Sequence, residues 1–274
     1  MKGTKNRFFG YDFSPDKRMF HVVVQMEDTP GALNTVLEAL RHHLNLIGSV
    51  SYSNPDGSAT WSGFAEALSK TVTEAKLKKL LASLPVAKAS MVESGEDGLL
   101  LDSYHMGIQV GDGDDFILLP SKGVSREYDS LSKLLGSGGE TVLYDEGYSL
   151  GEVNARYFQK LMGEVETRHR IGRLFMLYRT FGWGETETTI HGNGEKFEVK
   201  VSDCFECSFS RSTRSACSFM RGHLTGFLSK TFGTQFSGTE TKCRMRGDPI
   251  CQFEMTQAQP RVSGLSRNRG GASR

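Results

Sequence analysis

Five cysteines are the most chemically specific feature of this sequence, because all of them fall between Cys204 and Cys251. Cys217 lies early in an expected helix, and Cys243 and Cys251 lie on the two strands of an expected hairpin. Glu240, three residues before Cys243, would add a carboxylate oxygen. Three thiolates and one carboxylate suit a closed, structural Zn²⁺ site. On spacing alone, three buried free cysteines are the alternative.

The other two cysteines, Cys204 and Cys207, form a CxxC pair that elsewhere indicates zinc or redox chemistry. Apolar residues alternate with polar ones from 196 to 209, which predicts a strand. Residues three apart on a strand point to opposite faces. We therefore expect Cys207 in the core and Cys204 on the polar face, with neither in a metal or redox site.

Motifs for catalysis are absent from the sequence. It contains no GxxxxGK[ST] loop, no GxGxxG after a strand, no HExxH and no GxSxG. The seven histidines form no spaced constellation, and no segment is left over for a helix-turn-helix. An enzyme is therefore the less favoured class.

Composition and charge describe a globular chain of 274 residues with a formal charge of +1. No apolar run approaches the roughly 20 residues of a membrane helix, and the first residues lack the apolar stretch of a signal peptide. We therefore expect a cytoplasmic protein that binds no membrane. Residues 257–274 carry four arginines and no acid, which predicts a disordered basic tail. Nucleic acid is a possible partner only through that tail.

The first half of the chain reads as strand, helix, two strands, helix and strand over residues 18–93, after an N-terminal extension at 1–17. Thr29 and Thr73 are the expected caps of the two helices. This order predicts an α+β, ferredoxin-like βαββαβ domain with both helices on one face of the sheet.

The segment that opens the first helix, DTPGAL, resembles the corresponding loop of an ACT domain, a family whose usual role is regulatory binding of an amino acid or similar ligand in a dimer. A glycine at a helix start lets a ligand approach the backbone, and the N–H groups there favour a carboxylate. The alternative is a plain helix start. The resemblance places an amino-acid-type ligand at Asp28, Thr29, Pro30, Gly31, Ala32 and Leu33.

The second half, residues 105–256 after a linker at 94–104, is expected to hold helices first and an antiparallel sheet after them. The expected elements are a strand at 116–120, a helix around 128–134, a glycine break at 136–139, a helix from 149 to 181, a strand at 196–209, a helix at 213–230 and two closing strands. This is a larger α+β domain with helices packed on an antiparallel sheet.

Three motifs of this half, CRMRGDPICQFEM at 243–255, CSFMRGHL at 217–224 and the corner GWG at 182–184, resemble the 4-vinyl reductase domain. That family includes the ligand-sensing domain of phenol-responsive activators, and subunits of the TRAPP complex share its broader fold. The resemblance implies zinc held by Cys217, Glu240, Cys243 and Cys251. It also implies an apolar ligand pocket between the helices and the sheet. The candidate pocket residues, each of which also suits ordinary core packing, are Tyr178, Phe181, Trp183, Phe205, Phe219 and Phe227.

The leading interpretation is a small-molecule sensor or regulatory protein, a homodimer, that binds an amino-acid-type ligand, an apolar or aromatic ligand, or both. One alternative is a structural adaptor with a permanently filled pocket, as in TRAPP subunits. A subunit associated with a reductase is a further alternative, since the second domain's family name derives from such a reaction.

Overall fold

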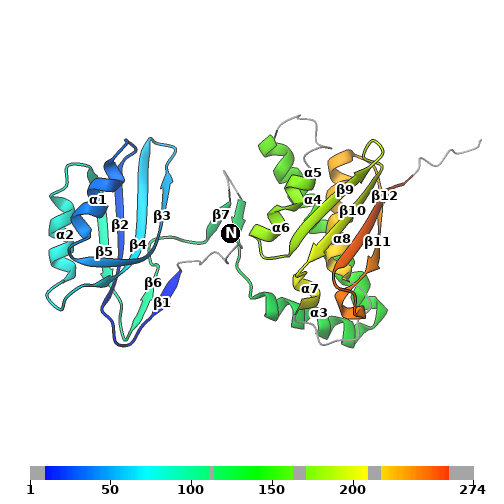
Figure 1. Cartoon of the computed structure of the whole chain (residues 1–274), viewed down its shortest axis with the longest axis horizontal. Coiled ribbons are helices and arrows are strands. Elements are labelled where there is room, and N and C mark those ends of the chain that lie inside the picture. The colour runs from blue at the N-terminus through cyan, green and yellow to red at the C-terminus, as the bar shows by residue number, and fades with distance from the viewer. Residues whose placement is uncertain (1–9, 111–113, 163–170, 209–216, 259–274) are drawn as a thin grey trace, which may run out of the picture. The chain divides into compact units, whose positions relative to one another are not determined.

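The computed structural model describes residues 10–110, 114–162, 171–208 and 217–258, which divide into two compact units, Met1–Val110 and Gly111–Arg274 (Figure 1). The boundary lies beyond the expected linker at 94–104, because those residues pack within the first unit. The expected basic tail falls, from residue 259 onward, outside the described residues.

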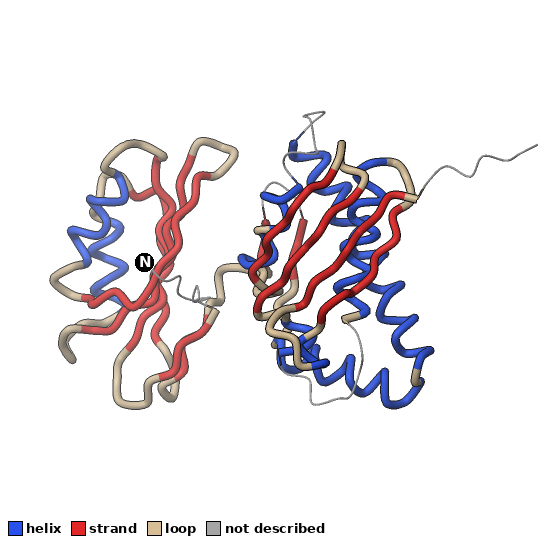
Figure 2. The backbone as a smooth tube through the Cα atoms, turned by 45° about the vertical axis from the view of Figure 1, so that its right-hand side comes forward, coloured by secondary structure: helices blue, strands red, loops and turns tan. Residues whose placement is uncertain are grey.

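The first unit has the element order expected from the sequence and is α+β. Its four main strands form one antiparallel sheet in the order β3-β4-β2-β5. Both helices lie on one face of this sheet (Figure 2). The elements are β2 (Met19–Glu27), α1 (Ala32–Leu40), β3 (Leu44–Ser53), β4 (Ser58–Ala67), α2 (Glu74–Ala82) and β5 (Ala87–Ser94).

Strand β2 divides its side chains between the two faces of the sheet. Phe20, Val22 and Val24 join the core beneath the helices. On the other face, a small apolar cluster forms from Met19, Phe64 and Leu100. Leu100 reaches this cluster because β6 (Leu99–Leu101) pairs with β1 (Tyr11–Phe13). The expected N-terminal extension and linker therefore both contribute strands to the first unit.

The two helix starts of this unit differ from each other. The Thr73 hydroxyl accepts a hydrogen bond from the Lys76 amide, so the cap expected for α2 is confirmed. The cap expected at Thr29 is wrong. Helix α1 begins at Ala32 after Gly31, whose φ of +91° is a conformation that glycine adopts without strain, and no side chain caps it.

The second unit confirms the expected order of helices followed by an antiparallel sheet, with strand order β11-β12-β10-β9 and helices on one face of it (Figure 2). Two short strands, β7 (Ile108–Val110) and β8 (Asp114–Phe116), lie near the boundary between the units. The remaining elements are α3 (Ser121–Leu135), α4 (Ser137–Met162), α5 (Ile171–Phe175), α6 (Leu177–Thr180), β9 (Glu185–His191), β10 (Lys196–Ser202), α7 (Phe205–Ser208), α8 (Ser218–Phe232), β11 (Phe236–Lys242), the 3₁₀ turn η2 (Arg244–Arg246) and β12 (Cys251–Gln257).

Two expected elements near the start of this unit need correction. The strand expected at 116–120 ends at Phe116, and the apolar side chain of Ile117 is 82% exposed. The long helix expected from 149 begins at Ser137, directly after the break at Gly136, whose φ is +57°. The isolated glycines at 138 and 139 are accommodated inside α4.

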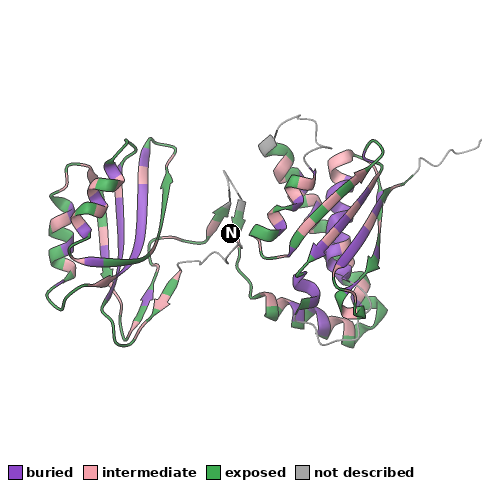
Figure 3. Ribbon diagram, in the orientation of Figure 1, coloured by how far each residue is buried: buried purple, intermediate pink, exposed green. Residues whose placement is uncertain are grey.

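Helix α8 packs against α4 at backbone distance because glycines face each other across the contact. A Cβ added to Gly222 would lie 2.0 Å from the Tyr144 carbonyl oxygen, and one added to Gly147 would lie 2.1 Å from that of Phe219. Helix α8 is buried over most of its length (Figure 3). This close packing fixes the position of its N-terminus. Within the described ranges, no helix combines the length and hydropathy that a membrane span requires.

Candidate functional site

The five cysteines converge because the strand that carries the CxxC pair ends early. Strand β10 stops at Ser202, Asp203 takes a left-handed φ of +52°, and α7 makes a single helical turn. Residues three apart share a face on a helical turn. The expectation that Cys204 and Cys207 point to opposite faces of a strand is therefore wrong.

All five thiols are buried beside the N-terminus of α8. The Cys217 Sγ lies 3.8 Å from the Sγ atoms of both Cys243 and Cys251 and 4.0 Å from that of Cys204. The Sγ atoms of Cys207 and Cys251 are 3.3 Å apart. In a tetrahedral zinc site with Zn–S bonds near 2.3 Å, neighbouring sulfurs lie about 3.8 Å apart. The cluster thus has close to the spacing that one tetrahedral ion requires.

Glu240, on β11, completes the group expected from the sequence. One oxygen, Oε2, accepts a hydrogen bond of 2.8 Å from the Cys217 amide. The other, Oε1, is buried and has no hydrogen-bond partner among the residues described. Its ligand atom and those of Cys217, Cys243 and Cys251 lie within 4.8 Å of one another. A buried carboxylate oxygen without a donor is costly unless a cation or proton meets it, so these residues fit a zinc ion.

Electrostatics in this cluster favour a cation. Burial, with a contribution from the neighbouring Cys243, raises the pKa of Glu240 to about 8. Hydrogen bonds from the Cys207 and Cys217 thiols lower the pKa of Cys243 to about 6. Without a metal, protons must therefore be shared among these groups near neutral pH. A divalent cation would displace those protons.

A further carboxylate, Glu206 on α7, holds the first turn of α8. Its side chain is fully buried and accepts hydrogen bonds of 3.2 and 2.9 Å from the amides of Phe219 and Met220. Together Glu206 and Glu240 satisfy three amides at this helix start, where the helix dipole also favours anions. The sequence analysis missed Glu206, because a glutamate within an expected strand gives no signal of a helix cap.

Next to the cysteines, aromatic side chains surround His223 of α8. The rings of Tyr178, Trp183, Phe219 and Phe227 all contact its imidazole. Phe205 contacts Trp183 and Phe219. We call these five aromatic residues and His223 the aromatic shell. Five of the six candidate pocket residues thus come together.

The sixth candidate, Phe181, lies apart from these contacts and stacks on Phe116, with ring centroids 5.5 Å apart. His223 was missed because a lone histidine on an apolar helix face gives no specific pattern. The shell and the cysteine cluster are adjacent along the chain, since Phe205 follows Cys204 and Phe219 lies two residues after Cys217.

His223 links two polar side chains inside the shell. The Asn154 amide nitrogen donates to Nε2 at 2.9 Å, and the Tyr178 hydroxyl lies 2.5 Å from Nδ1. Burial lowers the pKa of His223 to about 3, so the ring is neutral. With Nε2 accepting, Nδ1 carries the proton and donates to Tyr178. The hydroxyl hydrogen of Tyr178 then remains for a further acceptor.

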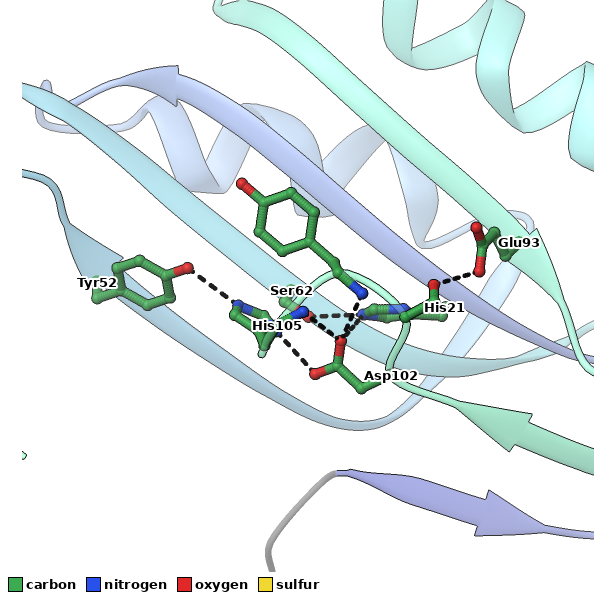
Figure 4. Close-up of polar contacts among 8 residues, drawn as sticks. His21, Tyr52, Ser62, Glu93, Asp102 and His105 are labelled. Atoms are coloured by element: carbon green, nitrogen blue, oxygen red, sulfur yellow. Dashed lines mark hydrogen bonds and ion pairs between the residues drawn. The ribbon is translucent and has the colours of Figure 1, made fainter. Parts of the chain in front are cut away.

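The first unit holds a second polar cluster, on the sheet face opposite its helices (Figure 4). His105 Nδ1 lies 2.7 Å from Asp102 Oδ2, and its Nε2 lies 3.0 Å from the Tyr52 hydroxyl. Buried His21 bonds Ser62 Oγ at 2.8 Å and lies 3.8 Å from Asp102. The expectation that the histidines form no constellation is wrong, because β6 brings Asp102 and His105 back onto the sheet.

The charges of this second cluster are balanced within it. Burial acts to raise the pKa of Asp102, but hydrogen bonds from the backbone and ring of His105 outweigh burial and lower it. Burial lowers the pKa of His21 against the pull of Asp102. An ionised Asp102 between two imidazoles fastens residues 102–105 to the sheet. The expected ligand loop at 28–33 is mostly exposed, and an amino-acid ligand there stays a prediction.

Comparison with known families supports the resemblance found for the second half. Residues 197–257, from β10 to the end of β12, match the model of the vinyl-4-reductase domain, which is the 4-vinyl reductase domain named above. An uncharacterized protein of Methanocaldococcus jannaschii is 26% identical over 128 residues, which are 46% of this chain and 70% of that protein. The 4-vinyl reductase resemblance is confirmed over the matched residues. The ACT resemblance of residues 18–93 stays a prediction.

Solved structures similar to this chain include three of related description. The phenol-responsive sensory domain of the transcription activator PoxR, solved with phenol, is 20% identical with a TM-score of 0.46, covering 53% of this chain and 77% of that one. A trafficking protein particle complex subunit 3 from Naegleria fowleri, bound covalently to palmitic acid, is 16% identical (TM-score 0.41; 51% and 95%). A vinyl-4-reductase family protein from Methanocaldococcus jannaschii is 19% identical (TM-score 0.38; 53% and 85%).

Proposed function

We propose that the second unit is a small-molecule sensor that binds an aromatic or apolar ligand within the aromatic shell, next to a structural zinc ion. The observation that carries this proposal is the buried Tyr178–His223–Asn154 chain, enclosed by aromatic rings beside the cysteine cluster. The match to the vinyl-4-reductase domain supports it, since the matched residues include the cysteines, Phe205, Phe219 and His223.

The shell suits a ligand that is flat, apolar and equipped with one polar atom. Its rings offer faces and edges to an aromatic molecule. The remaining hydroxyl hydrogen of Tyr178 offers a donor to a phenolic oxygen or a carbonyl. A site with few polar groups in an apolar lining selects for such molecules.

Zinc would be held by Cys217, Glu240, Cys243 and Cys251. With four protein ligands the ion has no open position, so it would supply folding stability rather than catalysis. It would join the start of α8 to β11 and β12. Displacement of Phe205 or Phe219 by a ligand would act directly on the chain next to this centre, which gives ligand binding a route to a change in conformation.

An adaptor with a closed core is the second candidate. The shell rings contact one another, for example with centroids of Trp183 and His223 4.8 Å apart. A ligand must therefore move these rings apart to enter. If they never separate, the shell is core only and the protein acts through its surface.

Thermal melting with phenol as the probe, on metal-loaded full-length protein, separates the two candidates. We expect the melting temperature of the second unit to rise by several degrees with phenol concentration. Tyr178→Phe should reduce this shift. The control Tyr144→Phe, which keeps the ring that Arg221 stacks on, should retain it. If phenol, cresols, indole and fatty acids all leave the melting temperature within about 1 °C of its starting value, the sensor proposal is wrong.

A further inference from the structure

The zinc site proposed above leaves Cys204 and Cys207 without a role, although both are buried in the same cluster. Two sets of four ligand atoms meet the distance requirement of one ion. The first comprises Cys217, Glu240, Cys243 and Cys251, and the second comprises Cys204, Cys207, Cys217 and Cys251, each with ligand atoms within 4.8 Å of one another. The sets share two thiols. A single ion would use one set and leave two groups of the other unused.

We propose that this cluster binds two divalent thiophilic ions, such as Zn²⁺, with Cys217 and Cys251 as bridging thiolates. Glu240 and Cys243 are the terminal ligands of the first ion, and Cys204 and Cys207 are those of the second. The proposal rests on the zinc ion of the proposed function and adds a second site to it. Each thiol that binds gives its proton to solvent.

The sulfur positions favour this arrangement over the other chemistries of clustered cysteines. The distances from Cys217 to Cys243, Cys251 and Cys204, 3.8, 3.8 and 4.0 Å, match the edges of tetrahedral thiolate sites, about 3.8 Å. An iron–sulfur cluster binds each thiolate to a different iron, which needs sulfurs farther apart. The closest pair, Cys207 and Cys251 at 3.3 Å, is well beyond the roughly 2.05 Å of a disulfide bond.

The local fold supplies the parts that the second ion needs. CxxC on a tight turn is a recurrent half of zinc sites. Here the turn is built, since the Cys204 carbonyl accepts hydrogen bonds from the Cys207 amide at 3.3 Å and from the Ser208 hydroxyl at 2.7 Å. These bonds place both sulfurs on the side that faces Cys217 and Cys251.

Charge also permits the second ion. One Zn²⁺ with four anionic ligands has a formal charge of −2. The second ion brings two positive charges together with two further thiolates, so the formal total remains −2. The N-terminus of α8, which begins at Cys217, offers a favourable potential to that residual negative charge.

Metal analysis of the purified full-length protein, refolded with excess Zn²⁺ or ¹¹³Cd²⁺ and desalted, tests this proposal. We expect two equivalents of metal in the wild type and two ¹¹³Cd resonances that couple through the shared thiolates. The double variant Cys204→Ser/Cys207→Ser should bind one equivalent, and so should Glu240→Gln/Cys243→Ser. The control Ser208→Ala should keep two. Circular dichroism of each variant verifies that it is folded.

Other results would overturn the proposal. One equivalent in the wild type that persists in Cys204→Ser/Cys207→Ser refutes the second ion and leaves the proposed zinc site intact. One equivalent that Cys204→Ser/Cys207→Ser abolishes moves the ion to the four-cysteine set and refutes both the bridge and the Glu240 site. No metal with five titratable thiols, or a mass lower by two hydrogens with Cys207 joined to Cys251, refutes both ions.

Discussion

The two units each gather side chains that bind metals, yet they treat them in opposite ways. In the first unit, Asp102 and His105 pair with each other and with Tyr52 at a partly exposed surface. In the second unit, five thiols and Glu240 are buried, and one oxygen of Glu240 meets no donor among the described residues.

This difference separates a polar cluster that is complete from one that still needs a partner. The carboxylate of Asp102 is hydrogen-bonded through both oxygens to His105, so it needs no cation. Buried thiols that contact mainly one another gain little from those contacts, and burial of their ionised forms requires a counter-charge. The same residue types therefore predict a fastening in one unit and a metal centre in the other.

Removal of metal should have the largest effect and should break the comparison between units most clearly. Structural zinc commonly contributes on the order of 10 kcal/mol to folding in small domains. We expect a strong chelator to abolish or greatly lower the unfolding transition of the second unit, measured by differential scanning calorimetry. The first unit's transition should not move. An unchanged second transition would show that the thiols are ordinary core residues.

The glycine contact between α4 and α8 predicts the next largest effect. Gly222→Ala places a methyl group 2.0 Å from the Tyr144 carbonyl, which must push the helices apart. We expect a loss of at least about 3 kcal/mol from the second unit in denaturant unfolding. Gly123→Ala is the matched control, because the nearest atom to its new Cβ is 3.9 Å away. Equal stability of the two variants would contradict the close packing of these helices.

Acid should destabilise the second unit more than the first. His223 has a pKa of about 3 when folded, below its ordinary value of 6.5, so its contribution is complete above pH 6.5 and declines as pH falls toward 3. At pH 5 this loss amounts to about 2 kcal/mol. His21 shifts in the same direction in the first unit. Unfolding of wild type and His223→Gln at pH 7 and pH 5 measures the share that belongs to His223. An identical pH dependence would contradict a neutral, buried imidazole.

The smallest effect is expected in the first unit. Asp102→Asn weakens the bond to His105 and should cost about 1 kcal/mol, with no change in bound metal. The exposed Asp16→Asn serves as the control and should have no effect. Loss of a bound metal in Asp102→Asn would show that His21, Asp102 and His105 form a second metal site, and the contrast between the two units would then fail.

Much of this organisation follows from local sequence patterns. Apolar alternation and helical spacing predicted the βαββαβ unit, the later antiparallel sheet and the cap at Thr73. The spacing of Cys217, Glu240, Cys243 and Cys251 predicted a group that the fold does bring together. These features depend on residues near one another in sequence or on a hairpin that joins them.

The remainder depends on contacts that no local pattern contains. Period-two alternation from 196 to 209 continued past the left-handed Asp203, where the strand becomes a helical turn, and so hid Cys204 and Cys207 from the cluster. Asp102 and His105 lie 81 and 84 residues from His21 along the chain and meet it only because β6 pairs with β1. Glu206 caps a helix from a different element.

The central claim, that the buried cysteine cluster is a metal centre, is tested most directly by zinc K-edge X-ray absorption on protein purified without a polyhistidine tag. We expect tightly bound zinc whose ligands are mainly sulfur at about 2.3 Å, with a minor oxygen contribution. Protein that contains no zinc, or zinc surrounded only by nitrogen and oxygen, would contradict it.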